Sequence, residues 1–214
     1  MKKLLLISLL GAAVALTACS KEETKTNTEE NTSVESTEVS AVKSRDEVKL
    51  ADNEILVIDE KTGESEKVET SNEKDEKTGL TFKLPANYEI EKTNDDYVNF
   101  KAPNDSYISL TTSTINKDVL SLPSFESGIS SKYNGRSRDD SHVLVDTTNY
   151  KDDFVKNNMV YMVTYTPKST KYKKVVAGIY ESDGNSYDFE IGLGNNEHSD
   201  DVVDTALGIL AGTK

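Results

Sequence analysis

The stretch "KVVAGIYESDGNSYDFEIGL", residues 174–193, contains two apolar runs joined by Ser-Asp-Gly-Asn. Asp-Gly at the centre of a two-residue loop is a strong β-hairpin signal, because both central positions of that turn favour residues that tolerate positive φ. The run 174–182 is apolar at successive positions, which is typical of a strand covered on both faces. We therefore expect a hairpin in the middle of a sheet that is packed on both sides.

Six further β-type runs precede this hairpin. They are residues 79–84, 88–91, 97–101, 107–115, 141–150 and 159–167. The first four are short and separated by Pro or by Asn/Asp clusters, which predicts a meander.

Two segments change from the period of a strand to that of a helix. Residues 121–134 begin with Ser121 and residues 199–212 begin with Ser199, and serine is a favoured helix N-cap. The apolar stripes are Leu122, Phe125, Ile129 and Tyr133 in the first segment and Val203, Leu207 and Leu210 in the second. The fold class is therefore α+β, with an antiparallel β-sheet on which a mid-chain and a C-terminal helix pack.

This order of elements, with "GLTFKLPANYE" (79–89) at its start and "ALGIL" (206–210) in the closing helix, resembles the PsbP-like α-β-α sandwich superfamily. That superfamily includes the extrinsic photosystem protein, a Ran-binding import factor and many exported bacterial lipoproteins. The resemblance covers the last two thirds of the chain. It supplies no shared catalytic residues, and it implies a binding or assembly factor rather than an enzyme.

The N-terminus has the pattern of a signal peptide, which we assign to residues 1–18. Lys2 and Lys3 precede an apolar run, residues 4–16, which is shorter than the ~20 residues that a membrane-spanning helix needs. The run ends in "LTAC" (16–19), and polar, charged residues follow at once. We therefore expect a targeting segment rather than a membrane span.

The tetrapeptide "LTAC" resembles the lipobox of bacterial lipoproteins at every position. The resemblance implies that Leu16, Thr17 and Ala18 are recognised by the signal peptidase and that Cys19 receives a diacylglyceryl group, with fatty acyl chains of the palmitate type. Two buried acyl chains hold a protein stably on a membrane, whereas one does not. The implied location is the extracytoplasmic face of a bacterial cell membrane, in the cell envelope.

The segment from Cys19 to residue 78 contains no aromatic residue, and its acidic residues outnumber the basic ones two to one. Such a composition offers little apolar area to offset chain entropy, so we expect a largely disordered linker at 19–78 and a globular domain at 79–214. Residues 53–69 are an exception. They contain two apolar runs around a Gly-containing turn, which is compatible with a short hairpin.

The formal charge of the 214-residue chain is −13. Binding to nucleic acid needs clustered Lys and Arg to displace counterions from phosphates, so we expect no nucleic-acid partner. Cys19 is the only cysteine, so a disulfide within the monomer is impossible.

Some short patterns mimic serine enzymes that recognise penicillin. "SAVK" (40–43) and "SNEK" (71–74) match Ser-x-x-Lys, and "KTG" occurs at 61–63 and 77–79. All four precede the expected domain, and no Ser-x-Asn lies between them, so we reject this interpretation.

Other candidate sites have simpler explanations. His198, Ser199 and Asp200 are adjacent in the sequence and cannot converge as a catalytic triad. His142 and His198 are the two histidines of the sequence, too few for a histidine-based metal cluster. Acidic turns at 95–96, 139–140 and 182–188 fit solvated loops better than Ca²⁺ sites. Tyrosines 161, 165, 172, 180 and 187 either form a ligand-binding face or, as we favour, pack between sheet and helix with their hydroxyls at the rim.

Two functional hypotheses follow. The first is a membrane-anchored, non-enzymatic binding or assembly factor with an unknown envelope partner and no cofactor. The second is an envelope-associated hydrolase whose site has no sequence signature. A cleft with converging polar groups and perturbed titration would favour the enzyme.

Overall fold

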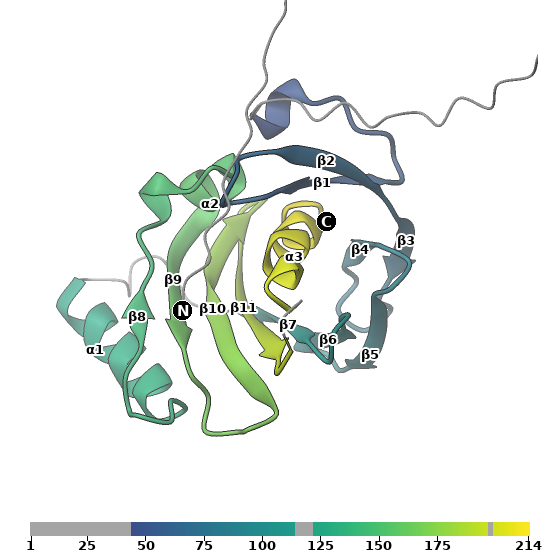
Figure 1. Ribbon diagram of the computed structural model, residues 1–214. Helices are drawn as coiled ribbons and strands as arrows, with labels where there is room; N and C mark the ends of the chain where they lie inside the picture. The colour runs from purple at the N-terminus through teal and green to yellow at the C-terminus, as the bar shows by residue number, and fades with distance from the viewer. Residues whose placement is uncertain (1–43, 114–121, 197–198) are drawn as a thin grey trace, which may run out of the picture. The chain divides into compact units, whose positions relative to one another are not determined.

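The computed structural model describes residues 44–113, 122–196 and 199–214. Its largest element is a seven-stranded sheet in the order β5-β6-β7-β11-β10-β9-β8, in which every neighbouring pair is antiparallel (Figure 1). The strands are β5 (Glu89–Thr93), β6 (Tyr97–Lys101), β7 (Tyr107–Ser113), β8 (Val143–Leu144), β9 (Met159–Tyr165), β10 (Tyr172–Ser182) and β11 (Asn185–Gly194). The prediction of an antiparallel sheet is confirmed.

The central hairpin of this sheet is β10–β11, as the sequence predicts. Ser182 pairs with Asn185, and the two turn residues between them, Asp183 and Gly184, have φ of 50° and 79°. Alternate residues of β10 face opposite sides: Val176 belongs to one buried cluster and Val175 to another. The central strands are therefore covered on both faces.

Helix α3 (Asp201–Ala211) covers one face, which we call the inner face. Leu207 and Leu210 of the predicted stripe are buried, but so are Val202 and Ile209, because the helix is enclosed from more than one side. The predicted N-cap is wrong. Asp200 precedes the helix without a side-chain capping bond, while the Ser199 hydroxyl donates to a backbone carbonyl.

Hairpin β1 (Glu54–Ile58) and β2 (Ser65–Glu69) lies against the side of α3 that faces away from the sheet (Figure 1). The four apolar residues of β1, Ile55–Ile58, are all buried. A Cβ on Gly208 of α3 would lie 2.8 Å from the Leu56 carbonyl oxygen, so the helix and the strand approach closely because residue 208 has no side chain. The hairpin expected at 53–69 therefore forms, and it completes the core.

This hairpin shows that the expected boundary near Gly79 is wrong. The described fold begins with a short 3₁₀ helix, η1 (Arg45–Glu47), and residues 54–74 form three strands. Aromatic content misleads here, because the aliphatic run 55–58 supplies the buried area instead. The remainder of the expected linker, 19–43, lies outside the described residues.

The predicted first strand, 79–84, is β4 (Thr81–Leu84), but it does not belong to a four-stranded meander. It pairs with β3 (Ser71–Lys74) in a separate hairpin. Phe82 and Leu84 are buried, and Thr81 exchanges backbone hydrogen bonds with the last residue, Lys214. The meander consists of β5, β6 and β7 alone.

The opposite, outer face of the sheet carries α1 (Leu122–Asn134), whose Ile129 and Tyr133 pack on β9 and β10. The region predicted as a strand at 141–150 is mostly not one. Only β8 pairs with the sheet, and η3 (Thr147–Asn149) follows, because the Asp146 side chain accepts a hydrogen bond from the Thr148 N–H. Helix α2 (Asp153–Asn158) was not expected. The architecture is α+β, with helices on both faces of an antiparallel sheet.

Candidate functional site

Polar side chains line the outer face of the sheet beside α1. Asn99, Ser109 and Glu190 are cross-strand neighbours on β6, β7 and β11, and Thr111 pairs with Asp188. The alternating residues of these strands, such as Leu110 and Phe189, are buried toward α3. A strand places alternate residues on opposite faces, so the polar set shares the outer face.

A cleft of about 310 Å³ lies between α1 and strands β7 and β11; we call it the α1 cleft. It is lined by Ser109, Thr111, Lys132, Arg136, Asp188 and Glu190. Lys132 pairs with Asp188, and Arg136 pairs with Glu190. Lys132 lies in the last turn of α1 and Arg136 in the turn that follows the helix, while Asp188 and Glu190, two residues apart on β11, share one face of the strand.

Tyrosines support both ends of these ion pairs. Tyr133 of α1 is buried against Tyr161 and Tyr165, with 3.4 Å between the Tyr133 and Tyr161 hydroxyl oxygens. Burial raises the pKa of Tyr133 above its ordinary value and the pKa of Tyr165 to about 12, so both rings stay neutral at physiological pH. The Tyr107 hydroxyl donates to Glu190 Oε2 at 3.4 Å.

The chemistry available in the α1 cleft is hydrogen bonding. Its lining holds two cations, two anions and two hydroxyls, and no histidine or cysteine. Each anion is already paired with a cation, so none is positioned as a free general base. The cleft is therefore suited to binding rather than to proton transfer.

A second cavity of about 350 Å³ lies between hairpin β1–β2 and the start of α3; we call it the α3 pocket. It is lined by Val57, Asp59, Glu64, Ser65, Glu66, Asp201, Asp204 and Thr205. Burial, together with the charges of Asp59 and Glu60, raises the pKa of Asp204 to about 6. Among the described residues no group of His, Cys, Asp and Glu is arranged to hold a metal ion.

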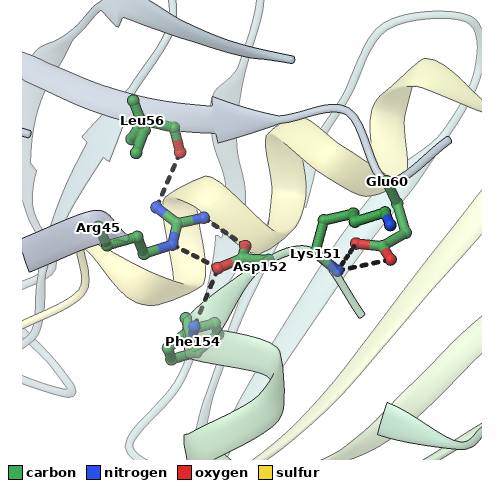
Figure 2. Close-up of polar contacts among 6 residues, drawn as sticks. All are labelled: Arg45, Leu56, Glu60, Lys151, Asp152 and Phe154. Carbon is green, nitrogen blue, oxygen red and sulfur yellow. Dashed lines mark hydrogen bonds and ion pairs between the residues drawn. The ribbon is translucent and has the colours of Figure 1, made fainter. Parts of the chain in front are cut away.

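A buried ion pair fixes the point where the described chain enters the fold (Figure 2). Arg45 donates to both carboxylate oxygens of Asp152 and, through Nη1, to the Leu56 carbonyl oxygen at 2.8 Å. Asp152 also accepts the Phe154 N–H at 2.9 Å, which caps α2. Nearby, Glu60 accepts the Lys151 N–H through both carboxylate oxygens. These contacts join η1, β1 and α2.

The residues of the predicted lipidation site, Leu16, Thr17, Ala18 and Cys19, lie outside the described residues. The structure does not gather the five tyrosines on one face. Tyr161 and Tyr165 lie under α1, whereas Tyr180 and Tyr187 stack on the α3 side with ring centroids 5.0 Å apart. Packing between sheet and helix is thus confirmed for these four, although the Tyr180 hydroxyl is buried rather than at the rim.

The patterns rejected as motifs occupy structural positions. Both "KTG" copies lie in hairpin turns, where Gly63 and Gly79 have φ of 79° and 75°. His142 Nδ1 lies 2.7 Å from Asn134 Oδ1, and Asp200 pairs with Lys173. His198 lies outside the described residues.

Sequence reasoning missed the residues of both ion-pair systems. Lys132 lies in the predicted helix, 121–134, but Arg136 lies two residues beyond its end, so helical spacing gave no signal for this pair. Asp188 and Glu190, two residues apart on a predicted strand, were an available signal for a shared sheet face. Arg45 and Asp152 had no such local signal, because 107 positions separate them.

The chain matches no known protein-family model. It matches no curated protein either. Within the part of the chain that the structure describes, no helix combines the length and the apolar character needed to cross a membrane.

Proposed function

We propose that the protein is a lipid-anchored domain on the extracytoplasmic face of a bacterial cell membrane, where it binds a partner and catalyses no reaction. The observation that carries the proposal is "LTAC" (16–19), which ends a short apolar run and contains the only cysteine of the chain. The acidic, non-aromatic residues after Cys19 are consistent with a tether.

The ordered contacts at Arg45 limit the length of this proposed tether. About 25 residues separate Cys19 from Arg45. As a flexible coil, a segment of that length has a root-mean-square reach of roughly 28 Å. The domain would thus stay near the lipid surface, at a shorter distance than a tether extending to residue 78 allows.

Replacing Cys19 with Ala tests the anchor. The variant should enter the aqueous phase in a detergent partition, or retain its signal peptide, while the wild type enters the detergent phase. Ser20→Ala is the matched control and should behave as the wild type does. A Cys19→Ala protein that partitions into detergent at its mature size would refute the anchor.

We also propose that the domain is a PsbP-like α-β-α sandwich. Support comes from the packing of α1 and α3 on opposite faces of one antiparallel sheet. An experimental structure superposed on members of that superfamily tests this, and a different strand order in the seven-stranded sheet would contradict it.

The second candidate function is an envelope-associated hydrolase. One observation favours it: Asp204 has a pKa raised to about 6 and lines a cavity of about 350 Å³. An enzyme that uses Asp204 should hydrolyse model ester, peptide or glycoside substrates with a pH profile that turns near 6. The Asp204→Asn variant should lose that activity. If the wild-type protein hydrolyses none of the three substrate classes, the hydrolase hypothesis is refuted.

A further inference from the structure

We infer that the α1 cleft binds a neutral, polyhydroxylated ligand, namely a segment of an uncharged oligosaccharide. This rests on the proposed binding function and gives it a ligand class. The inference begins from the lining, in which polar residues come from β7, from β11 and from α1 with the turn that follows it.

The charges of the cleft exclude a strongly charged ligand. Lys132 is balanced by Asp188 and Arg136 by Glu190, so the lining has no net charge. An anion would approach two carboxylates, and a metal cation would approach two basic side chains. Either ligand would have to break an existing ion pair, whereas a neutral one leaves both pairs intact.

The hydrogen-bonding capacity of the cleft suits hydroxyl groups. A guanidinium has five N–H donors and a carboxylate about four acceptor positions, so a single ion pair leaves most of them unused. Among the described residues, the Ser109 and Thr111 hydroxyls have no hydrogen-bond partner. A ligand hydroxyl both donates and accepts, and can therefore use an arginine N–H and a carboxylate oxygen in the same cleft.

An aromatic surface extends the site beyond a single sugar ring. The Tyr107 hydroxyl contacts Glu190 at the cleft, and the Tyr107 ring meets Tyr172 edge-on with centroids 4.8 Å apart. The Tyr107 ring lies on Gly192, where a Cβ would come within 1.9 Å of it. Tyrosine offers a large, rigid contact surface at low entropic cost, against which the C–H face of a second ring can pack.

The test is isothermal titration of the full-length mature lipoprotein in detergent with chitotetraose and with cellotetraose. At least one of these neutral tetrasaccharides should bind with a Kd between about 10 µM and 1 mM. The affinity should change little when salt is raised, because no net charge is exchanged. A sulfated tetrasaccharide of similar length should bind at least tenfold more weakly.

Variants separate binding from folding. Glu190→Gln should weaken binding about tenfold, the effect of losing one charge-assisted hydrogen bond. Glu89→Gln is the matched control, because Glu89 forms an exposed pair with Lys101 away from the cleft, and it should bind as the wild type does. The double variant Lys132→Asp with Asp188→Lys exchanges the two charges and keeps an ion pair. It should therefore fold but bind the tetrasaccharide at least tenfold more weakly.

Three results would overturn the inference: no binding of either neutral tetrasaccharide at about 5 mM, binding that both cleft variants retain, or preference for the sulfated ligand. None of these depends on the anchor. If the wild-type protein partitions into detergent but binds no glycan, only the ligand class is refuted. If the wild-type protein stays in the aqueous phase but binds glycan, only the anchor is refuted.

Discussion

The guanidinium of Arg45 donates to both carboxylate oxygens of Asp152, from Nε to Oδ1 at 2.6 Å and from Nη2 to Oδ2 at 2.5 Å. The Asp152 side chain is only 3% exposed. A single carboxylate thus joins the beginning of the described fold to the first turn of α2, and the Leu56 carbonyl extends the contact to β1.

Arg45→Ala should destabilise the domain by about 3 kcal/mol, because it leaves Asp152 as a buried, unpaired charge. Chemical denaturation of the two proteins measures this difference. Lys101→Ala is the control, since it removes an exposed pair and should cost far less than Arg45→Ala. Equal losses in the two variants would show that the Arg45 contact does not stabilise the fold.

Limited proteolysis should trim the mature chain to a core that begins near Ser44. Strand β1 is buried against α3, so cleavage within 54–58 requires opening of the core. Mass spectrometry of the resistant fragment identifies its first residue. A core starting near 79 would restore the boundary expected from aromatic content and contradict the packing of β1.

Leu207→Ala should lower the free energy of unfolding by about 2–5 kcal/mol, because Leu207 is 2% exposed inside the enclosed helix. The thermal midpoint should fall by several degrees. Leu144→Ala is the matched control, since Leu144 is 61% exposed and the change should stay within about 0.5 kcal/mol. A Leu207→Ala loss as small as the control's would mean that α3 is not packed.

Asp204→Asn should stabilise the domain at pH 7. The pKa of Asp204 is about 6 in the folded state and near its ordinary value of 3.8 in the unfolded state, so the folded state binds the proton more tightly. The ionised carboxyl therefore reduces stability above pH 6, and this cost is relieved as the pH falls toward 3.8. After allowance for solvent screening, the gain in Asp204→Asn is about 1–2 kcal/mol at pH 7.

Urea denaturation of wild type and Asp204→Asn at pH 7 and at pH 3.5 measures this linkage. The difference between the two proteins should nearly vanish at the lower pH, where both side chains are neutral. Thr205→Ser, a conservative change at the neighbouring pocket residue, should show no such pH dependence. A difference that is the same at both pH values would exclude ionisation of Asp204 as its cause.

The elements with strong local signals could be predicted from sequence. Asp183 and Gly184 specify their turn through conformations that few residues tolerate, and α3 has a stripe of regular spacing. Which strands pair with one another was harder to predict from the sequence. Thr81–Leu84 pairs with β3, because residues 71–74 form an adjacent strand despite containing no apolar side chain.

The candidate site was harder to predict because it depends on juxtaposition. Lys132 and Asp188 meet only when α1 packs on the outer face beside β11. Val143 and Leu144 show how a local polar contact can override an apolar pattern. Their apolar sequence predicted part of a longer strand, but Asp146 redirects the backbone into η3 by accepting the Thr148 N–H.

The position of α3 between the sheet and β1 sets an order for folding during synthesis. Strand β1 emerges roughly 140 residues before the helix that buries it, so its apolar side chains lack their principal partner until the chain is almost complete. Early folding of the N-terminal half is thereby disfavoured, which would favour the export that we propose, because a chain crosses a membrane before it folds. A ribosome that stops short of residue 201 would release a product with an exposed apolar hairpin, a ready substrate for quality-control proteases.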